Sequence, residues 1–102
     1  MTSLVFARFF PKAGQEAQVE SILRTMVEHT RREPGCRRYD LYEAKGANGA
    51  RTFCLLERYA DAAALQAHRE TAHYKSYRGS IMELLDQPIE VSLLDPLDER
   101  QA

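Results

Sequence analysis

The hydrophobic period of this chain switches repeatedly between two and 3.6 residues, and this switching constrains the fold more than any other feature. Residues 4–10 (LVFARFF) are aromatic and β-branched in character, and the turn signal PKAG at 11–14 follows, so a strand is predicted here. From Gln15 the apolar residues recur at helical spacing, which predicts an amphipathic helix with one buried stripe. Pro34 and Gly35 are expected to end this helix, because proline disfavours helical geometry at the preceding residue and glycine permits the reversal.

The rest of the chain is predicted to form a hairpin, two helical segments and a last strand. The strands are predicted at 36–44, 51–59 and 89–93. The connection 45–50 (KGANGA) is of the hairpin type. Asp61 and Thr71 are predicted to cap two helical segments, and Gly79 is expected to interrupt the second of them. On the strand at 51–59, Glu57 interrupts an otherwise apolar row.

The predicted order, β-α-β-β-α-β, is that of a ferredoxin-like α+β fold, in which helices cover one face of a four-stranded antiparallel sheet. The other face is expected to be apolar as well. One set of residues that it would carry is Val5, Ala7, Phe9, Cys54 and Leu56. The other possible set consists of the residues that alternate with these along the same strands. A monomer does not leave such a surface in water. Packing two sheets face to face removes it, so we expect a homodimer that forms a dimeric α+β barrel.

Length and charge narrow the class of protein further. The 102 residues fit one domain, predicted over residues 1–96, with a polar C-terminal tail over 97–102. The net charge of −1 disfavours nucleic acid or an anionic membrane as a partner. The sequence shows no signal peptide and no apolar run near the roughly 20 residues of a membrane span, so a cytoplasmic location is expected. Cys36 and Cys54 are expected to be buried free thiols.

Several segments, taken together and in order, carry a family resemblance. They are EPGC (33–36) with YDLY (39–42), LERYAD (56–61) leading into ALQAH (64–68), and TAHY (71–74). This set resembles the antibiotic biosynthesis monooxygenase family, in particular its quinol monooxygenase-like branch, over Leu4 to Asp95. The resemblance implies a pocket between sheet and helices in each protomer of a dimer. It also implies oxidation of quinols or anthrones with O₂ and without flavin, haem or metal.

Other branches of the family do different chemistry. The haem-degrading branch has an Asn on the first strand and a Trp on the second helix. Residues 4–10 contain no Asn and the chain contains no Trp, so this branch is excluded. Fold membership alone does not fix the reaction, because related members also isomerise small phosphorylated metabolites.

Cofactor-free oxygenation needs a base in a dry pocket, because the substrate must lose a proton before it can reduce O₂. His73, His68 and Glu57 are the catalytic candidates, and the resemblance places the same residue types at these positions. Which of the three is the base stays open. In the structural alternative the histidines cap helix ends, and Glu57 forms an ion pair with Arg38 or Arg58.

A planar aromatic substrate needs aromatic and apolar walls. The residues predicted to supply them are Phe6, Tyr39, Phe53, Tyr74, Tyr77 and Met82. No metal or cofactor is predicted: the spacing of His68 and His73 points them apart on a continuous helix, and only a break near Arg69 and Glu70 would bring them together. His29 is expected to be a solvated surface residue.

The predicted function is a cofactor-independent monooxygenase that oxidises a quinol or polyphenolic aromatic with O₂. Two alternatives stay open. A cofactor-free isomerase of a small phosphorylated metabolite would need an anion site, for which the candidates are Arg37, Arg38, Arg51 and Arg69. The other alternative is a small-ligand-binding or stress-response module without chemistry.

Overall fold

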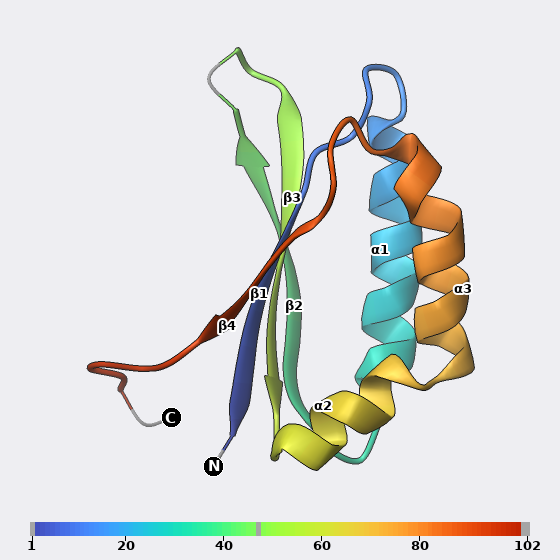
Figure 1. The fold of residues 1–102 in the computed structure, drawn as a ribbon. Coiled ribbons are helices and arrows are strands. Elements are labelled where there is room, and N and C mark those ends of the chain that lie inside the picture. The colour runs from blue at the N-terminus through green and yellow to red at the C-terminus, as the bar shows by residue number, and fades with distance from the viewer. Residues whose placement is uncertain (1, 47, 101–102) are drawn as a thin grey trace.

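The computed structural model describes residues 2–46 and 48–100. In chain order the elements are β1 (Ser3–Phe9), α1 (Glu16–Thr30), β2 (Cys36–Lys45), β3 (Arg51–Tyr59), α2 (Ala62–Arg69), α3 (Ala72–Ile81), the 3₁₀ helix η1 (Met82–Leu84) and β4 (Glu90–Leu94) (Figure 1). The predicted order of elements is confirmed, with α2 and α3 together in the second helical position. The domain over 1–96 and the tail over 97–102 stay predictions. Met1, Ala47, Gln101 and Ala102 lie outside the described residues.

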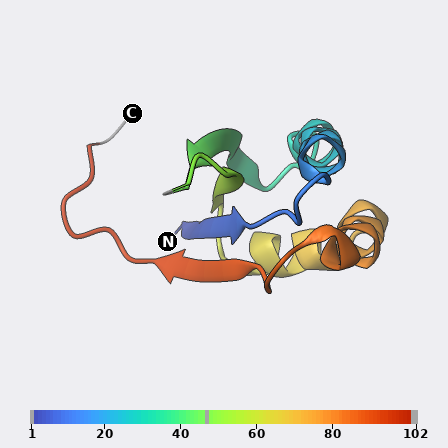
Figure 2. The ribbon, with the colours of Figure 1, turned by 90° about the horizontal axis from the view of Figure 1, so that it is seen from above.

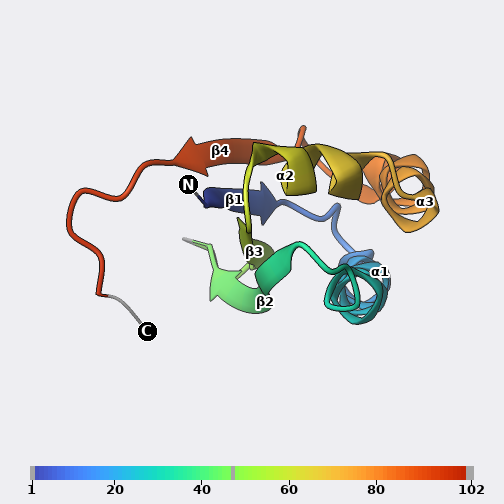
Figure 3. The same cartoon turned by 90° about the horizontal axis from the view of Figure 1, so that it is seen from below.

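The four strands form one antiparallel sheet in the order β2-β3-β1-β4. The two end-on views show the sheet on one side, with α1 and α3 side by side on the other (Figures 2 and 3). This arrangement confirms the α+β ferredoxin-like class. The shorter α2 lies at the end of the sheet where α1 ends and α3 begins (Figure 1).

The core lies between the sheet and the helices. Its buried apolar side chains are Ala7 and Phe9 of β1, Tyr39 of β2, Phe53 and Leu55 of β3, Val19, Leu23 and Met26 of α1, and Tyr77, Ile81 and Leu85. Burying one such side chain stabilises the fold by about 1.5–3 kcal/mol. The α1 members lie at helical spacing, which is why the period of the sequence predicted this helix.

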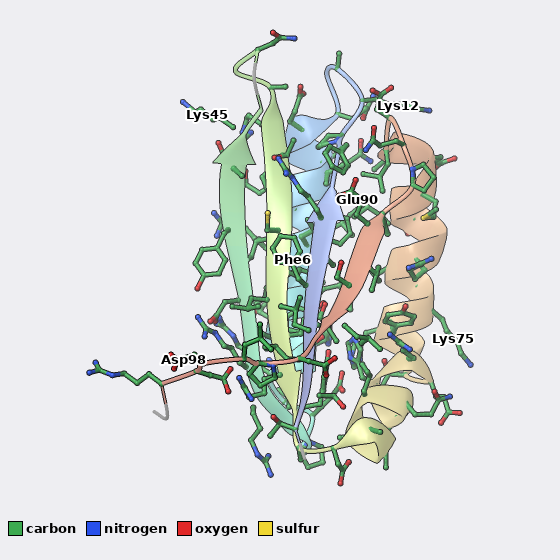
Figure 4. The ribbon with its side chains drawn as sticks, turned by 60° about the vertical axis from the view of Figure 1, so that its left-hand side comes forward. Phe6, Lys12, Lys45, Lys75, Glu90 and Asp98 are labelled. Atoms are coloured by element: carbon green, nitrogen blue, oxygen red, sulfur yellow. The ribbon has the colours of Figure 1, made fainter. Side chains whose placement is uncertain are left out.

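The outer face of the sheet differs from either predicted set. Alternation along β1 turns Val5, Ala7 and Phe9 toward the helices, so Leu4 and Phe6 lie on the outer face. Phe6 projects from this face in Figure 4. Through the β1–β3 register these residues are neighbours of Cys54 and Leu56, so the outer face combines members of both predicted sets. Neither predicted set describes the outer face correctly. The reason is that β1 and β3 have apolar residues on both faces, so the alternation of polar and apolar residues does not show which face is which.

β4 is the least covered part of the sheet. It pairs with β1 alone, and all five of its residues are exposed. Val91 and Leu93 belong to the helix-facing rows of the sheet, yet their exposed fractions are 47% and 66%. The helix-facing side of the sheet is therefore only thinly covered at β4.

The predicted helix caps are confirmed. The Asp61 carboxylate accepts a hydrogen bond from the Ala64 N–H, and the Thr71 hydroxyl accepts one from the Tyr74 N–H. The predicted break at Gly79 is wrong, because α3 runs through this residue to Ile81. A glycine costs a helix only about 1 kcal/mol, less than the burial of Tyr77 and Ile81 on its two sides returns. Both cysteines are free, with Cys54 buried and Cys36 only partly so.

None of the helices within the described residues is long and apolar enough to cross a membrane.

Candidate functional site

The turn between α2 and α3 brings together two histidines that are five positions apart. α2 ends at Arg69 and α3 begins at Ala72, with Thr71 between them. The Thr71 hydroxyl donates to the carbonyl oxygen of His68 at 2.7 Å and also caps α3. His68 in the last turn of α2 and His73 in the first turn of α3 therefore lie close together, with ring centroids 6.1 Å apart. This is the break near Arg69 and Glu70 that the sequence left open.

Glu33 joins the two imidazoles. Its Oε2 atom lies 2.8 Å from Nδ1 of His68 and 2.5 Å from Nε2 of His73. Glu33 belongs to the turn after α1, where its N–H donates to the Thr30 carbonyl and its own carbonyl accepts from the Cys36 N–H. The Glu33 side chain is only 14% exposed, so one partly buried carboxylate accepts hydrogen bonds from both rings.

Gly35 lets this turn approach α2. A Cβ atom at position 35 would lie 2.5 Å from the Cβ of Ala64, closer than side-chain carbons can come. The carbonyl of Gly35 also accepts a hydrogen bond from the Ala60 N–H at 2.8 Å, next to the start of α2. The sequence EPG at 33–35 thus has a structural reason: the glycine permits the close approach that brings Glu33 to His68.

His68 is held in one tautomer. A carboxylate only accepts hydrogen bonds, so Nδ1 of His68 carries the hydrogen that Glu33 binds, and Nε2 of the neutral ring has a free lone pair. The residue is 2% exposed, and its ring lies 5.1–5.8 Å from those of Tyr39, Tyr59 and Tyr74. Burial lowers the pKa of His68, while the hydrogen bond with Glu33 acts in the opposite direction. A neutral imidazole with an available nitrogen can accept a proton.

His68 lines a small, partly enclosed cavity of about 30 Å³ between the sheet and the helices. The other walls include Tyr39 and Glu57 from the sheet, Leu65 from α2, Tyr74 and Tyr77 from α3, and Val91 of β4. This volume has room for one or two water-sized molecules. The phenols of Tyr39 and Tyr77 stay protonated, because burial raises the pKa of both. The cavity is therefore lined by hydrogen-bond donors, apolar surface and two groups that can take up a proton.

Glu57 is the second proton acceptor of the cavity. The β-sheet register places it between Val5 and Tyr39 on the helix-facing side, where it is 7% exposed. Burial raises the pKa of Glu57 to about 7, although the hydrogen bond from the Tyr59 hydroxyl (2.6 Å) acts against this shift. A carboxyl group with this pKa exists in both protonation states at neutral pH, which suits general acid–base chemistry.

The expected ion pair of Glu57 with Arg38 or Arg58 is wrong. Both arginines lie on the outer face, where Arg38 binds Asp40 and Arg58 binds Thr2. Strand alternation places Arg58 and Glu57 on opposite faces of the sheet, so no rotamer can join them.

The structure brings part of the predicted site together. Glu57, His68, Tyr39, Tyr74 and Tyr77 share the cavity. His73 lies on the far side of Glu33 and does not line the cavity.

Other predicted residues lie elsewhere. Phe6 is on the outer face of the sheet (Figure 4). Phe53 lies toward the opposite end of the sheet, beside the Arg51 guanidinium, and Met82 is 42% exposed in η1. Neither residue lines the cavity.

Glu33 and three neighbours of the site were not predicted from the sequence as site residues. Arg78 and Val91 line the cavity, and the ring of His29 stacks on that of His73 at 5.4 Å, although His29 is exposed as expected. Glu33 carried a signal, since it opens the EPG segment of the family resemblance. No motif in the sequence indicated a place in the site for Arg78, Val91 or His29.

Glu33, His68 and His73 can also hold a cation. One donor atom from each of these three side chains lies within 4.8 Å of the others. One carboxylate and two imidazoles form a common ligand set for transition metals.

The comparisons with known proteins bear on the family and the fold of the chain. The sequence profile of the family "Antibiotic biosynthesis monooxygenase" matches residues 2–80. The chain is 44% identical over 98 residues to "Putative monooxygenase Rv0793" of Mycobacterium tuberculosis, covering 96% of this chain and 94% of that protein. It is 40% identical over 80 residues to "Putative monooxygenase YcnE" of Bacillus subtilis, covering 78% and 82% respectively. The solved structure of Rv0793 superposes with a TM-score of 0.89 at 40% identity, covering 99% of this chain and 100% of that one. The chain therefore belongs to the antibiotic biosynthesis monooxygenase family.

Proposed function

We propose that this protein is a cofactor-independent monooxygenase that oxidises a quinol or polyphenolic aromatic with O₂. The observation that carries the proposal is the partly enclosed cavity that both His68 and Glu57 line, because each of them can accept a proton there. Family membership and the names of the relatives support a monooxygenase-type function. The substrate class and the use of O₂ without a cofactor are our inference.

The proposed reaction balances without an external reductant. A base takes the phenolic proton, and the electron-rich phenolate reduces O₂. A carbon–oxygen bond forms between a ring carbon and O₂, and the resulting peroxide takes back the proton from the base to give a hydroperoxide. A second base removes the proton on that carbon as the O–O bond breaks and a carbonyl group forms. The leaving hydroxide takes that proton and departs as water. The quinol supplies all four electrons, one oxygen atom enters the product, and the other leaves as water.

Each residue of the cavity has a task in this scheme. Nε2 of His68 takes the phenolic proton, while Glu33 holds the His68 ring and its tautomer from behind. Glu57, with its pKa of about 7, takes the second proton. Tyr74 and Tyr77 offer hydrogen bonds to the substrate oxygens.

An aromatic ring needs more room than about 30 Å³, so the cavity must open when the substrate binds. The wall at Val91 is thinly covered by other elements, since this residue is 47% exposed. We therefore place substrate entry at β4.

The experiment is incubation of the purified chain with a panel of quinols under air, under ¹⁸O₂ and without oxygen, with no added cofactor. We expect a hydroxyquinone that carries one ¹⁸O atom, and loss of turnover in His68→Gln. Glu83→Gln, at an exposed position of η1, is the control, and circular dichroism checks that each variant is folded. Equal product without oxygen, or no product from any quinol under air, would contradict the proposal.

The isomerase alternative keeps one supporting observation. Arg69 and Arg78 line the cavity and offer positive charge for a phosphorylated ligand. Two of the other arginines predicted for an anion site form ion pairs away from the cavity: Arg51 binds Glu20 and Glu43, and Arg38 binds Asp40. Inhibition of quinol turnover by simple phosphate esters, or oxygen-independent conversion of such esters, would favour this alternative. Ligand binding without turnover in either assay would favour the module without chemistry.

We also infer that two copies of the chain associate. The outer face of the sheet carries Leu4, Phe6 and Leu56 with no helix over them, and Leu94 of β4, which pairs with Leu4, is 38% exposed on the same face. A second sheet packed on this surface would bury it. Sedimentation velocity at micromolar concentration should give the mass of a dimer, and a monomer mass would contradict the inference.

A further inference from the structure

We propose that Glu33, His68 and His73 form a binding site for one divalent late-transition-metal ion, with Zn²⁺ as the reference ion. The donor atoms are Oε2 of Glu33, Nδ1 of His68 and Nε2 of His73, and all three lie within 4.8 Å of one another. The site is distinct from the cavity, because the metal would bind on the side of His68 that faces away from it. Binding itself does not depend on the proposed oxygenation.

The distances are compatible with this role after a small movement. In a tetrahedral zinc site with bonds of about 2.0–2.1 Å, neighbouring donor atoms lie about 3.3 Å apart. The Glu33 oxygen now lies 2.8 Å and 2.5 Å from the two imidazole nitrogens. A cation between them requires the carboxylate to withdraw by less than about 1 Å, which rotation of a glutamate side chain allows. The metal then replaces the two N–H hydrogen bonds with three coordinate bonds, one to each ring nitrogen and one to the carboxylate, and the hydrogen of each neutral ring lies on its other nitrogen.

The backbone around the site already holds the ligands in place. The hydroxyl of Thr71 binds the His68 carbonyl and caps the helix that carries His73. Glu33 sits on a turn fixed by the close contact of Gly35 with Ala64. Ligands held by such contacts lose little freedom when a metal binds, so three of them suffice for tight binding.

An entry path is also present. A groove of about 450 Å³ lies between α1 and α3, and His29, His73 and Ser76 are among its lining residues. The His73 side chain is 22% exposed, so a hydrated ion can reach the ligands from this groove. A water molecule in the groove can serve as the fourth ligand, as in zinc sites with three protein ligands. The donor set of two imidazoles and one carboxylate favours Zn²⁺, Cu²⁺ or Ni²⁺ over Mg²⁺ and Ca²⁺, which prefer oxygen ligands.

Metal binding has a consequence for the proposed reaction, and this consequence rests on the proposed function. A metal on Nδ1 of His68 takes the position of the hydrogen that Glu33 now binds. The ring hydrogen of neutral His68 then lies on Nε2, which becomes a donor instead of an acceptor. The ion would therefore inhibit quinol oxidation.

The test is calorimetric titration of the full chain with Zn²⁺, together with the visible absorption of the Co²⁺-loaded protein. We expect one Zn²⁺ per chain and the absorption of four-coordinate Co²⁺. Loss of an outer-shell partner weakens metal binding about 10–100-fold, so loss of a direct ligand in Glu33→Gln or His73→Gln should weaken it by more than about 100-fold. Thermal melts confirm that these variants are folded.

Two control variants make the test specific. His29→Gln alters the neighbouring imidazole that is outside the ligand set, and Cys36→Ser removes the nearby thiol; both should keep the affinity of the original chain. The proposal is overturned if millimolar Zn²⁺ does not bind, or if Glu33→Gln and His73→Gln bind as tightly as the original chain. Loss of binding in Cys36→Ser alone would also overturn it. Turnover is not measured in these experiments, so a failure of quinol oxidation does not affect the result for metal binding.

Discussion

Replacing Glu57 with glutamine should make the protein more stable above neutral pH. The residue is a nearly buried carboxyl group, and its hydrogen-bond partner is the Tyr59 hydroxyl. In Glu57→Gln the side-chain carbonyl can still accept this hydrogen bond, and the volume is unchanged. The substitution therefore removes the ionisation of the group and little else.

The magnitude follows from the pKa of Glu57, which burial raises from 4.5 to about 7. Between these two values the folded chain keeps the proton while the unfolded chain loses it. The free energy of unfolding therefore falls as pH rises through this window, and the decrease stays in full above the folded pKa. A shift of about 2.5 units corresponds to about 3 kcal/mol at 1.36 kcal/mol per unit. Glu57→Gln should recover about this much at pH ~8 and almost none at pH ~4.

His68 acts with the opposite sign in part of the same range. Burial lowers the pKa of His68, so the unfolded chain takes up a proton on this residue before the folded chain does. Its contribution to stability is present above the unfolded pKa of about 6.5 and is lost as pH falls below that value. The contribution of His68 to the pH dependence is common to both proteins, so subtracting one curve from the other removes it.

The assay is urea unfolding, followed by circular dichroism, of the original chain and of Glu57→Gln at half-unit intervals of pH. The difference in unfolding free energy should grow by about 3 kcal/mol from pH ~4 to pH ~8, with its midpoint between the two pKa values. Glu83→Gln removes the same charge from an exposed position and is the control. A difference that does not change with pH would refute the assignment of a raised pKa to Glu57.

Two further predictions concern the turns that position the site. Gly35→Ala should destabilise the fold by about 1–3 kcal/mol in urea unfolding, because the new Cβ would overlap Ala64. Gly79→Ala, at an open helical position, should stabilise it by about 0.5–1 kcal/mol, and equal effects of the two changes would contradict the packing argument. Thr71→Val removes the cap of α3 and should lower the free energy of unfolding by about 1 kcal/mol. Nuclear magnetic resonance should also show altered ¹⁵N shifts of the imidazoles of His68 and His73, because the Thr71 hydroxyl joins the two helices that carry them. Unchanged shifts would mean that the junction of α2 and α3 does not depend on this hydroxyl.

Much of the fold was predictable, because each element has its own local signal. Apolar residues at helical spacing located α1, and alternation placed Glu57 on the same face as Phe53, Leu55 and Tyr59. Which side chains of β1 point toward the helices was not predictable. Alternation assigns a face only where one side of a strand is polar, and β1 has Leu4 and Phe6 on one side and Val5, Ala7 and Phe9 on the other.

The candidate site was predictable only in part, because its central contacts join distant parts of the chain. Glu33 binds side chains 35 and 40 positions further along, and no local period reports such a contact. The relation of His68 to His73 depends on the angle between α2 and α3. The sequence shows the Thr71 cap that ends one helix and begins the next, but this cap does not define the angle.

The two carboxylates near His68 have opposite environments, and the difference indicates what each can do. Glu33 accepts hydrogen bonds from two imidazoles, so it can hold His68 in one tautomer. Glu57 accepts one hydrogen bond from a phenol and forms no ion pair within the described residues, so burial raises its pKa to about 7. A glutamine would fit the same space without the cost of about 3 kcal/mol that ionisation imposes above neutral pH. A residue that served packing alone would not need an ionisable group there, so this cost favours proton transfer as the role of Glu57.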